Sequence, residues 1–219
     1  LQGGSPSGYY KEESFREQLR IAAADEEIWA GVPGPDSQPW CNTAFDPTGG
    51  LKPEYLARLA RVLDRADELG FVVILGLFYQ GQDERLTDEA AVLKAVDNAC
   101  AWVIGGGYRN VVIEVNNECD VASYEHEILQ PERVAELIGR VKGRALDAGA
   151  RLLAATSYRG GGLPGDDVIA ASDFVLLHGN GVTRPERIGE MVRAVRRSPA
   201  YRPMPIVFNE DDHYEFAAP

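Results

Sequence analysis

Short apolar runs alternate with helix-like segments from residue 51 onward, and this alternation constrains the fold more than any other feature of the sequence. Continuous runs of Val, Ile, Leu and Phe are typical of strands that are covered on both faces. Strands are predicted on this basis at 71–78, 111–115, 151–156, 174–177 and 206–208. Helical apolar spacing predicts helices at 51–69, 87–105, 131–141 and 185–197, and Thr87 is expected to cap the second of them. A Gly-rich loop and a brief segment at 166–171 link the third and fourth strands. Strands that alternate with helices form βαβ units and a parallel sheet.

Two architectures contain such units, the doubly wound open sheet and the (β/α)8 TIM barrel. An open sheet normally has a Gly-rich phosphate loop after its first strand, and Gly160-Gly161-Gly162 lacks the GxGxxG spacing. We therefore predict an α/β fold of the barrel type. A complete barrel needs eight strands in about 250 residues, so we expect an incomplete one, a fragment that lacks the first one or two strands and the eighth. Residues 1–219 are taken as a single partial domain, with an irregular loop and helix region at 1–50 and βα repeats at 51–216.

Composition narrows the partners of the chain. The 22 basic and 34 acidic residues give a net charge of −12, which argues against nucleic acid and against an anionic membrane surface. No run of about 18 apolar residues is present, so no membrane span is predicted. The three cysteines fit neither a disulfide framework nor a zinc pattern, and no cofactor is predicted. The compartment and the oligomeric state stay open.

Two of the predicted strands stop abruptly at an Asn-Glu pair. The run at 111–115 continues into Asn116-Asn117-Glu118, and the run at 206–208 continues into Asn209-Glu210. Parallel barrels build their active sites from side chains at the carboxyl ends of strands. Glycoside hydrolysis needs one carboxylic acid to protonate the departing oxygen, and a second carboxylate to attack the anomeric carbon or to activate water. Glu118 and Glu210 are therefore the predicted catalytic pair.

The Asn-Asn-Glu at 116–118, together with Glu210 at the end of a later strand, resembles the large barrel clan of retaining glycosidases. This clan includes the cellulase, mannanase and β-galactosidase families, and the similarity covers roughly residues 51–213. The resemblance implies that Asn117 contacts the sugar 2-hydroxyl, that Glu118 is the acid/base and that Glu210 is the nucleophile. Clan members usually carry an Arg near the end of strand one and often an aromatic residue on strand eight, and neither strand is found in this sequence. The predicted partner is an oligo- or polysaccharide.

Further substrate-binding residues are predicted at other strand ends and in loops. His178 and Asn180 follow the run at 174–177 and are expected to hydrogen-bond the nucleophile or a sugar hydroxyl. Sugars also bind to flat aromatic faces with polar groups at the rim, and Trp40, Tyr79 and Tyr158 are the candidates for such platforms.

Two other functions stay open at this point. A barrel that has lost catalysis would be a non-catalytic carbohydrate-binding protein. A metal-dependent barrel hydrolase would use His178, His213 and the acidic residues around Glu210. No HxH or HExxH spacing supports a metal site, so none is predicted.

Overall fold

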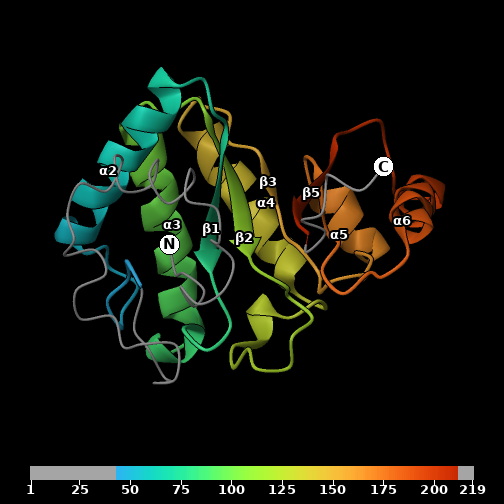
Figure 1. The fold of residues 1–219 in the computed structure, drawn as a ribbon. Helices are drawn as coiled ribbons and strands as arrows, with labels where there is room; N and C mark the ends of the chain where they lie inside the picture. The colour runs from blue at the N-terminus through green and yellow to red at the C-terminus, as the bar shows by residue number, and fades with distance from the viewer. Residues whose placement is uncertain (1–42, 212–219) are drawn as a thin grey trace.

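The computed structural model describes residues 43–211, and helices alternate with strands throughout this part of the chain (Figure 1). The helices are α2 (Pro53–Glu68), α3 (Glu89–Gly105), α4 (Val134–Asp147), α5 (Asp166–Ala171) and α6 (Pro185–Arg197). The strands are β1 (Val73–Phe78), β2 (Val111–Asn116), β3 (Ala154–Ala155), β4 (Val175–His178) and β5 (Ile206–Glu210). Two short 3-10 helices, η2 (Asp83–Arg85) and η3 (Glu127–Leu129), lie in the loops after β1 and β2. These positions confirm the predicted strands and the four predicted helices, and the brief segment at 166–171 forms the short helix α5.

The strands form two separate sheets, both parallel. Strands β1, β2 and β3 make a three-stranded sheet in that order, and β4 pairs with β5 in a two-stranded sheet. The predicted (β/α)8 barrel, complete or partial, is therefore wrong for the residues that the structure describes. A barrel requires every strand to pair with the next one around the axis, and this chain of pairing stops between β3 and β4.

An acidic side chain binds the edge of β3 at the place where the pairing stops. Strand β3 is only two residues long, and the outer edge of Ala154 is bound by Asp173, which directly precedes Phe174 and β4. The Ala154 amide donates to a carboxylate oxygen of Asp173 at 3.1 Å, and the Asp173 amide donates to the Ala154 carbonyl at 2.9 Å. One of the two hydrogen bonds at this junction is thus accepted by a side chain, and the other is a main-chain bond.

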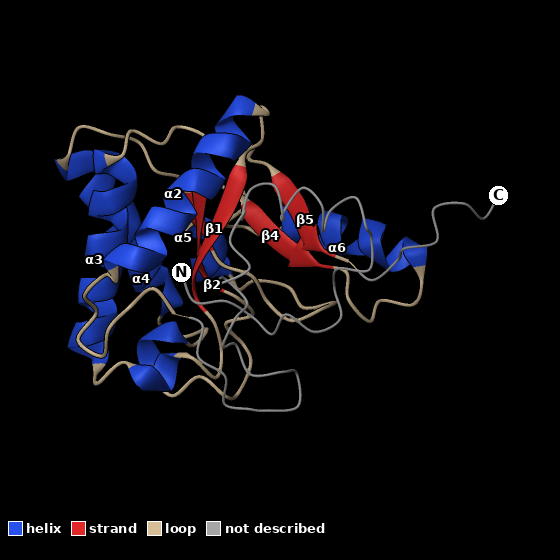
Figure 2. Cartoon of the chain, turned by 60° about the vertical axis from the view of Figure 1, so that its left-hand side comes forward, coloured by secondary structure: helices blue, strands red, loops and turns tan. Residues whose placement is uncertain are grey.

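Apolar layers hold the two sheets and their helices together. Helices α2, α3 and α4 lie on one side of the three-stranded sheet, and α5 and α6 lie beside the two-stranded sheet (Figure 1). The main core joins α2, α3 and α4 to β1 and β2, with Leu63 and Ile113 fully buried. A smaller core packs Met191 of α6 against β4. A third cluster contains Ala155 of β3 and Leu176 of β4, so it spans the junction. The β1–β2 pair and the β4–β5 pair consequently lie next to each other (Figure 2).

Local signals set the helix boundaries. Pro53 opens α2, and that helix ends before Gly70, whose φ of +75° suits glycine. The start of α3 differs from the sequence prediction, which placed the cap at Thr87. Asp88 is the residue that caps α3, because its carboxylate accepts a hydrogen bond from the Ala91 amide at 2.8 Å.

Among residues 43–211, none of the helices combines the length and the apolar character needed to cross a bilayer.

Candidate functional site

Three strand ends bring two carboxylates and an imidazole together where the two sheets meet. Glu118 follows β2, His178 is the last residue of β4, and Glu210 is the last residue of β5. Nδ1 of His178 lies 3.1 Å from Oε1 of Glu118 and 3.7 Å from Oε2 of Glu210. One oxygen of each carboxylate and this nitrogen all lie within 4.8 Å of one another. The predicted convergence of positions 118 and 210 is thus present in the structure.

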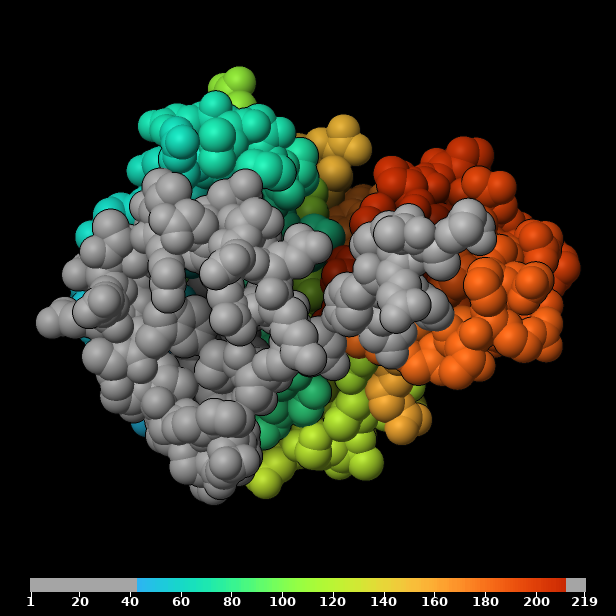
Figure 3. Space-filling model, in the orientation of Figure 1, coloured from blue at the N-terminus to red at the C-terminus, as the bar shows by residue number. Residues whose placement is uncertain are grey.

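The three side chains differ in their access to solvent. His178 is 0% exposed, whereas the side chains of Glu118 and Glu210 are 18% and 34% exposed. The imidazole therefore lies beneath two carboxylates that face solvent. In the space-filling view, dark red atoms from the end of the described chain lie beside green atoms from its middle, near the centre of the face (Figure 3).

A local irregularity in the two-stranded sheet places His178 opposite Glu210. The register shifts between Leu177 and His178, so that Leu177 pairs with Phe208 but His178 pairs with Glu210. The Gly179 amide then donates to the Glu210 carbonyl at 2.7 Å. The Asn180 side chain donates through Nδ2 to Oε2 of Glu210 at 2.9 Å. The contacts from His178 and Asn180 therefore both fall on the same oxygen of Glu210.

The loop after β2 has an unusual backbone conformation at the catalytic candidate. Glu118 has a φ of +49° and is the non-glycine residue with positive φ in the described part of the chain. This region is disfavoured for residues with a Cβ. The Glu118 amide donates to Oγ of Ser157 at 2.9 Å, and the next amide, of Cys119, donates to the Ser157 carbonyl at 2.9 Å. Ser157, in the segment after β3, thus accepts hydrogen bonds from two consecutive amides that follow β2.

Asn117, the predicted ligand of the sugar 2-hydroxyl, lies beside Glu118 and is mostly buried. Its amide donates to the Phe78 carbonyl at 3.1 Å, and its carbonyl accepts from the Tyr124 hydroxyl at 2.5 Å. Both backbone groups are therefore bound to the protein.

Sequence reasoning did not identify Glu114 as a site residue. It lies on β2, it is buried, and its Oε1 accepts a hydrogen bond from Oγ of Ser157 at 2.6 Å. Glu114 is paired with Gly76 of β1, and a Cβ on Gly76 would lie 3.9 Å from Oε2 of Glu114, an ordinary van der Waals distance. The available signal was the single charged residue inside the apolar run Val-Val-Ile-Glu-Val.

Burial and charge shift the protonation of both inner groups. Burial raises the pKa of Glu114 to about 7, against the opposing effects of the Ser157 hydrogen bond and of His178. Burial also disfavours the charged form of His178. The hydrogen bond to Glu118 and the negative charges of Glu210, Glu114 and Glu118 outweigh that effect, and the pKa of His178 is raised above its ordinary value.

The other predicted substrate-binding residues fare differently. Trp40 and His213 lie outside the described residues. Tyr79 is half-buried and directly follows β1. Tyr158 is 9% exposed and packs in the main core, so little of its ring surface remains for stacking on a sugar.

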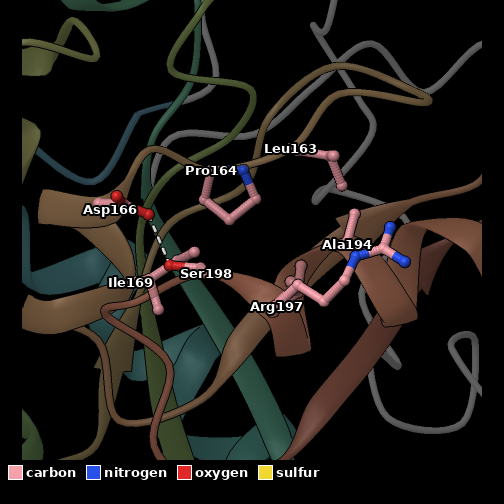
Figure 4. A pocket seen from close by; sticks show the side chains of 8 residues that line it. Leu163, Pro164, Asp166, Ile169, Ala194, Arg197 and Ser198 are labelled. Atoms are coloured by element: carbon pink, nitrogen blue, oxygen red, sulfur yellow. Dashed lines mark hydrogen bonds between the residues drawn. The ribbon is translucent and has the colours of Figure 1, made fainter.

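A surface pocket of about 310 Å³ lies between the loop before α5 and helix α6 (Figure 4). The Ser198 hydroxyl donates to Oδ1 of Asp166 at 2.5 Å on one side of it, and Leu163 and Pro164 lie on another. None of the predicted site residues lines this pocket, so it is separate from the cluster of Glu118, His178 and Glu210.

Comparison with known proteins yields no relative: no family model, no curated protein and no solved structure matches the chain. The chemistry of the site therefore rests on its geometry. Two carboxylates a few ångströms apart with a buried imidazole between them are suited to acid/base and nucleophilic chemistry, and the same three groups offer ligand atoms for a metal ion.

Proposed function

We propose that the chain is a glycoside hydrolase that cleaves a β-glycosidic bond with retention of configuration. The observation that carries this proposal is the approach of Glu118 and Glu210, which have an oxygen each within 4.8 Å of the other and of His178. Retaining enzymes hold their two carboxyl groups about 5–5.5 Å apart, whereas inverting enzymes hold them about 6.5–9.5 Å apart to admit a water. The short separation favours retention.

Glu210 is the nucleophile in this proposal. Its Oε2 accepts the Asn180 hydrogen bond and lies nearest His178, which assigns Oε1 to the attack on the anomeric carbon. The attack forms the glycosyl–enzyme bond and breaks the bond to the leaving oxygen. The Asn180 donor on Oε2 fixes the direction of the carboxylate and stabilises its charge.

Glu118 is the acid/base, and His178 shares its proton. The 3.1 Å contact between Oε1 of Glu118 and Nδ1 of His178 accommodates one proton, on either atom. Glu118 delivers a proton to the leaving oxygen in the first step. In the second step it takes a proton from the water that attacks the glycosyl–enzyme, which releases the sugar and frees Glu210. Asn117 is the candidate for holding the 2-hydroxyl during both steps.

The test uses aryl β-glycosides that carry different sugars and leaving groups, with product configuration followed by NMR. E210A should abolish turnover. E118A should retain the first step only for leaving groups that need no proton, and added azide should accelerate its second step. E186A is the matched control, since the Glu186 side chain is 71% exposed on α6. Turnover by E210A, or a product of inverted configuration, contradicts the proposal.

A metal-dependent hydrolase is the second candidate, because Glu118, His178 and Glu210 offer three ligand atoms in one cluster. Turnover that survives a strong chelator eliminates it. A non-catalytic carbohydrate-binding protein is the third. Sugar binding by calorimetry without hydrolysis of any tested glycoside would favour that alternative.

A further inference from the structure

We propose that Ser157 and Glu114 are positioning residues, which fix the backbone of Glu118 through a two-bond relay and so aim its carboxylate at His178 and Glu210. The hydrogen bonds that hold the Glu118 backbone do not depend on the function of the protein, whereas their effect on catalysis rests on the proposed role of Glu118. The relay begins at the buried carboxyl group on β2, passes through a hydroxyl after β3, and ends on the amide of Glu118.

The relay ends at Glu118, the residue whose backbone conformation is disfavoured. Glu118 adopts the left-handed conformation, which the surrounding structure must impose on a side chain with a Cβ. The hydrogen bonds from the Glu118 and Cys119 amides to Ser157 impose it. This conformation sets the direction in which the Glu118 side chain leaves the backbone, and that side chain reaches Nδ1 of His178 at 3.1 Å.

Glu114 orients the Ser157 hydroxyl, which accepts the hydrogen bond from the Glu118 amide. A serine hydroxyl rotates to suit its neighbours, and it can accept from the Glu118 amide only while its own hydrogen points elsewhere. Oε1 of Glu114 takes that hydrogen at 2.6 Å. Ser157 is fully buried, so water does not compete for the hydroxyl.

Glu114 is a single carboxyl group within the otherwise apolar part of β2, which indicates a specific role for it. A carboxyl group inside an apolar strand is costly unless it is hydrogen-bonded, and Glu114 accepts such a hydrogen bond from the Ser157 hydroxyl. The apolar residues Ile113 and Val115 on either side of Glu114 belong to the main core. Glu114 is therefore directed to the opposite side of β2, the side of the catalytic cluster.

Ser157→Ala tests the relay, and Ser172→Ala is the matched control. Ser172 is also buried, and its hydroxyl donates to the Val168 carbonyl at 2.7 Å, away from the site. We expect S157A to exchange the Glu118 amide hydrogen about tenfold faster, as for the loss of one buried hydrogen bond. We expect its kcat to fall about tenfold or more while KM changes less than about twofold. S172A should lose comparable stability without either effect.

Two substitutions at Glu114 separate positioning from stability. E114L removes the acceptor and should reproduce the S157A effects, whereas E114Q keeps an acceptor oxygen and should recover most of the kcat lost in E114L. Unchanged exchange at Glu118 in both S157A and E114L overturns the inference. If the wild-type chain hydrolyses no glycoside, the proposed function fails, and the Glu118 amide exchange alone decides whether the relay exists.

Discussion

Replacing Glu114 by glutamine should change how the stability of this protein depends on pH. Burial raises the pKa of Glu114 from its ordinary value of 4.5 to about 7. A carboxyl group whose pKa is raised by folding favours the folded state while it is protonated. Its contribution is present below about pH 4 and is lost as the pH rises through about 7. Glutamine has nearly the shape of the protonated acid and cannot ionise.

The size of the effect follows from the shift. Each tenfold change in a protonation equilibrium corresponds to about 1.4 kcal/mol, so ionising Glu114 in the folded state costs on the order of 3 kcal/mol. At pH 5 the wild-type protein and E114Q should have free energies of unfolding within about 1 kcal/mol of each other. At pH 8 E114Q should be the more stable by up to about 3 kcal/mol. The raised pKa of His178 also makes stability fall as the pH rises, and this fall is smaller in E114Q because the negative charge of Glu114 is one cause of the raised pKa.

Urea unfolding at pH 5, 6, 7 and 8, followed by far-UV circular dichroism, measures the difference. E186Q provides the control, because the Glu186 side chain is 71% exposed, and its difference from wild type should not vary with pH. Equal slopes of stability against pH for wild type and E114Q would refute the assignment of Glu114 as a buried group that ionises near neutral pH.

Two further substitutions test the fold. D88A should destabilise the protein by about 1 kcal/mol in urea unfolding, because it removes the cap on the Ala91 amide. T87A, at the exposed position before it, should change stability by less than about 0.5 kcal/mol. A larger effect of T87A would restore the sequence-based assignment of the cap to Thr87. I113A should lower the free energy of unfolding by about 2–5 kcal/mol, because Ile113 is fully buried on the central strand β2. V72A, at a residue that is 68% exposed, should leave the melting temperature nearly unchanged. Similar melting temperatures for the two variants would contradict the position of the core.

Much of the candidate site was predictable from local sequence patterns. The Asn-Glu pairs at the ends of two apolar runs identified Glu118 and Glu210, and the polar residues after a third run identified His178 and Asn180. These predictions rest on one rule, that parallel strands gather their carboxyl ends at one edge. This rule did not identify Glu114 or Ser157, because neither lies at the end of its strand next to a recognisable partner.

The sequence by itself determined which segments are helices and which are strands, because apolar periodicity records the faces that each segment buries. It did not determine how the strands pair. Where β3 and β4 meet, Asp173 binds the edge of Ala154, and the relay from Glu114 to Glu118 joins residues on different strands. Contacts of this kind depend on which edges and side chains meet in three dimensions, so only the tertiary structure decided that the sheet divides in two and that Glu118, His178 and Glu210 meet where it does.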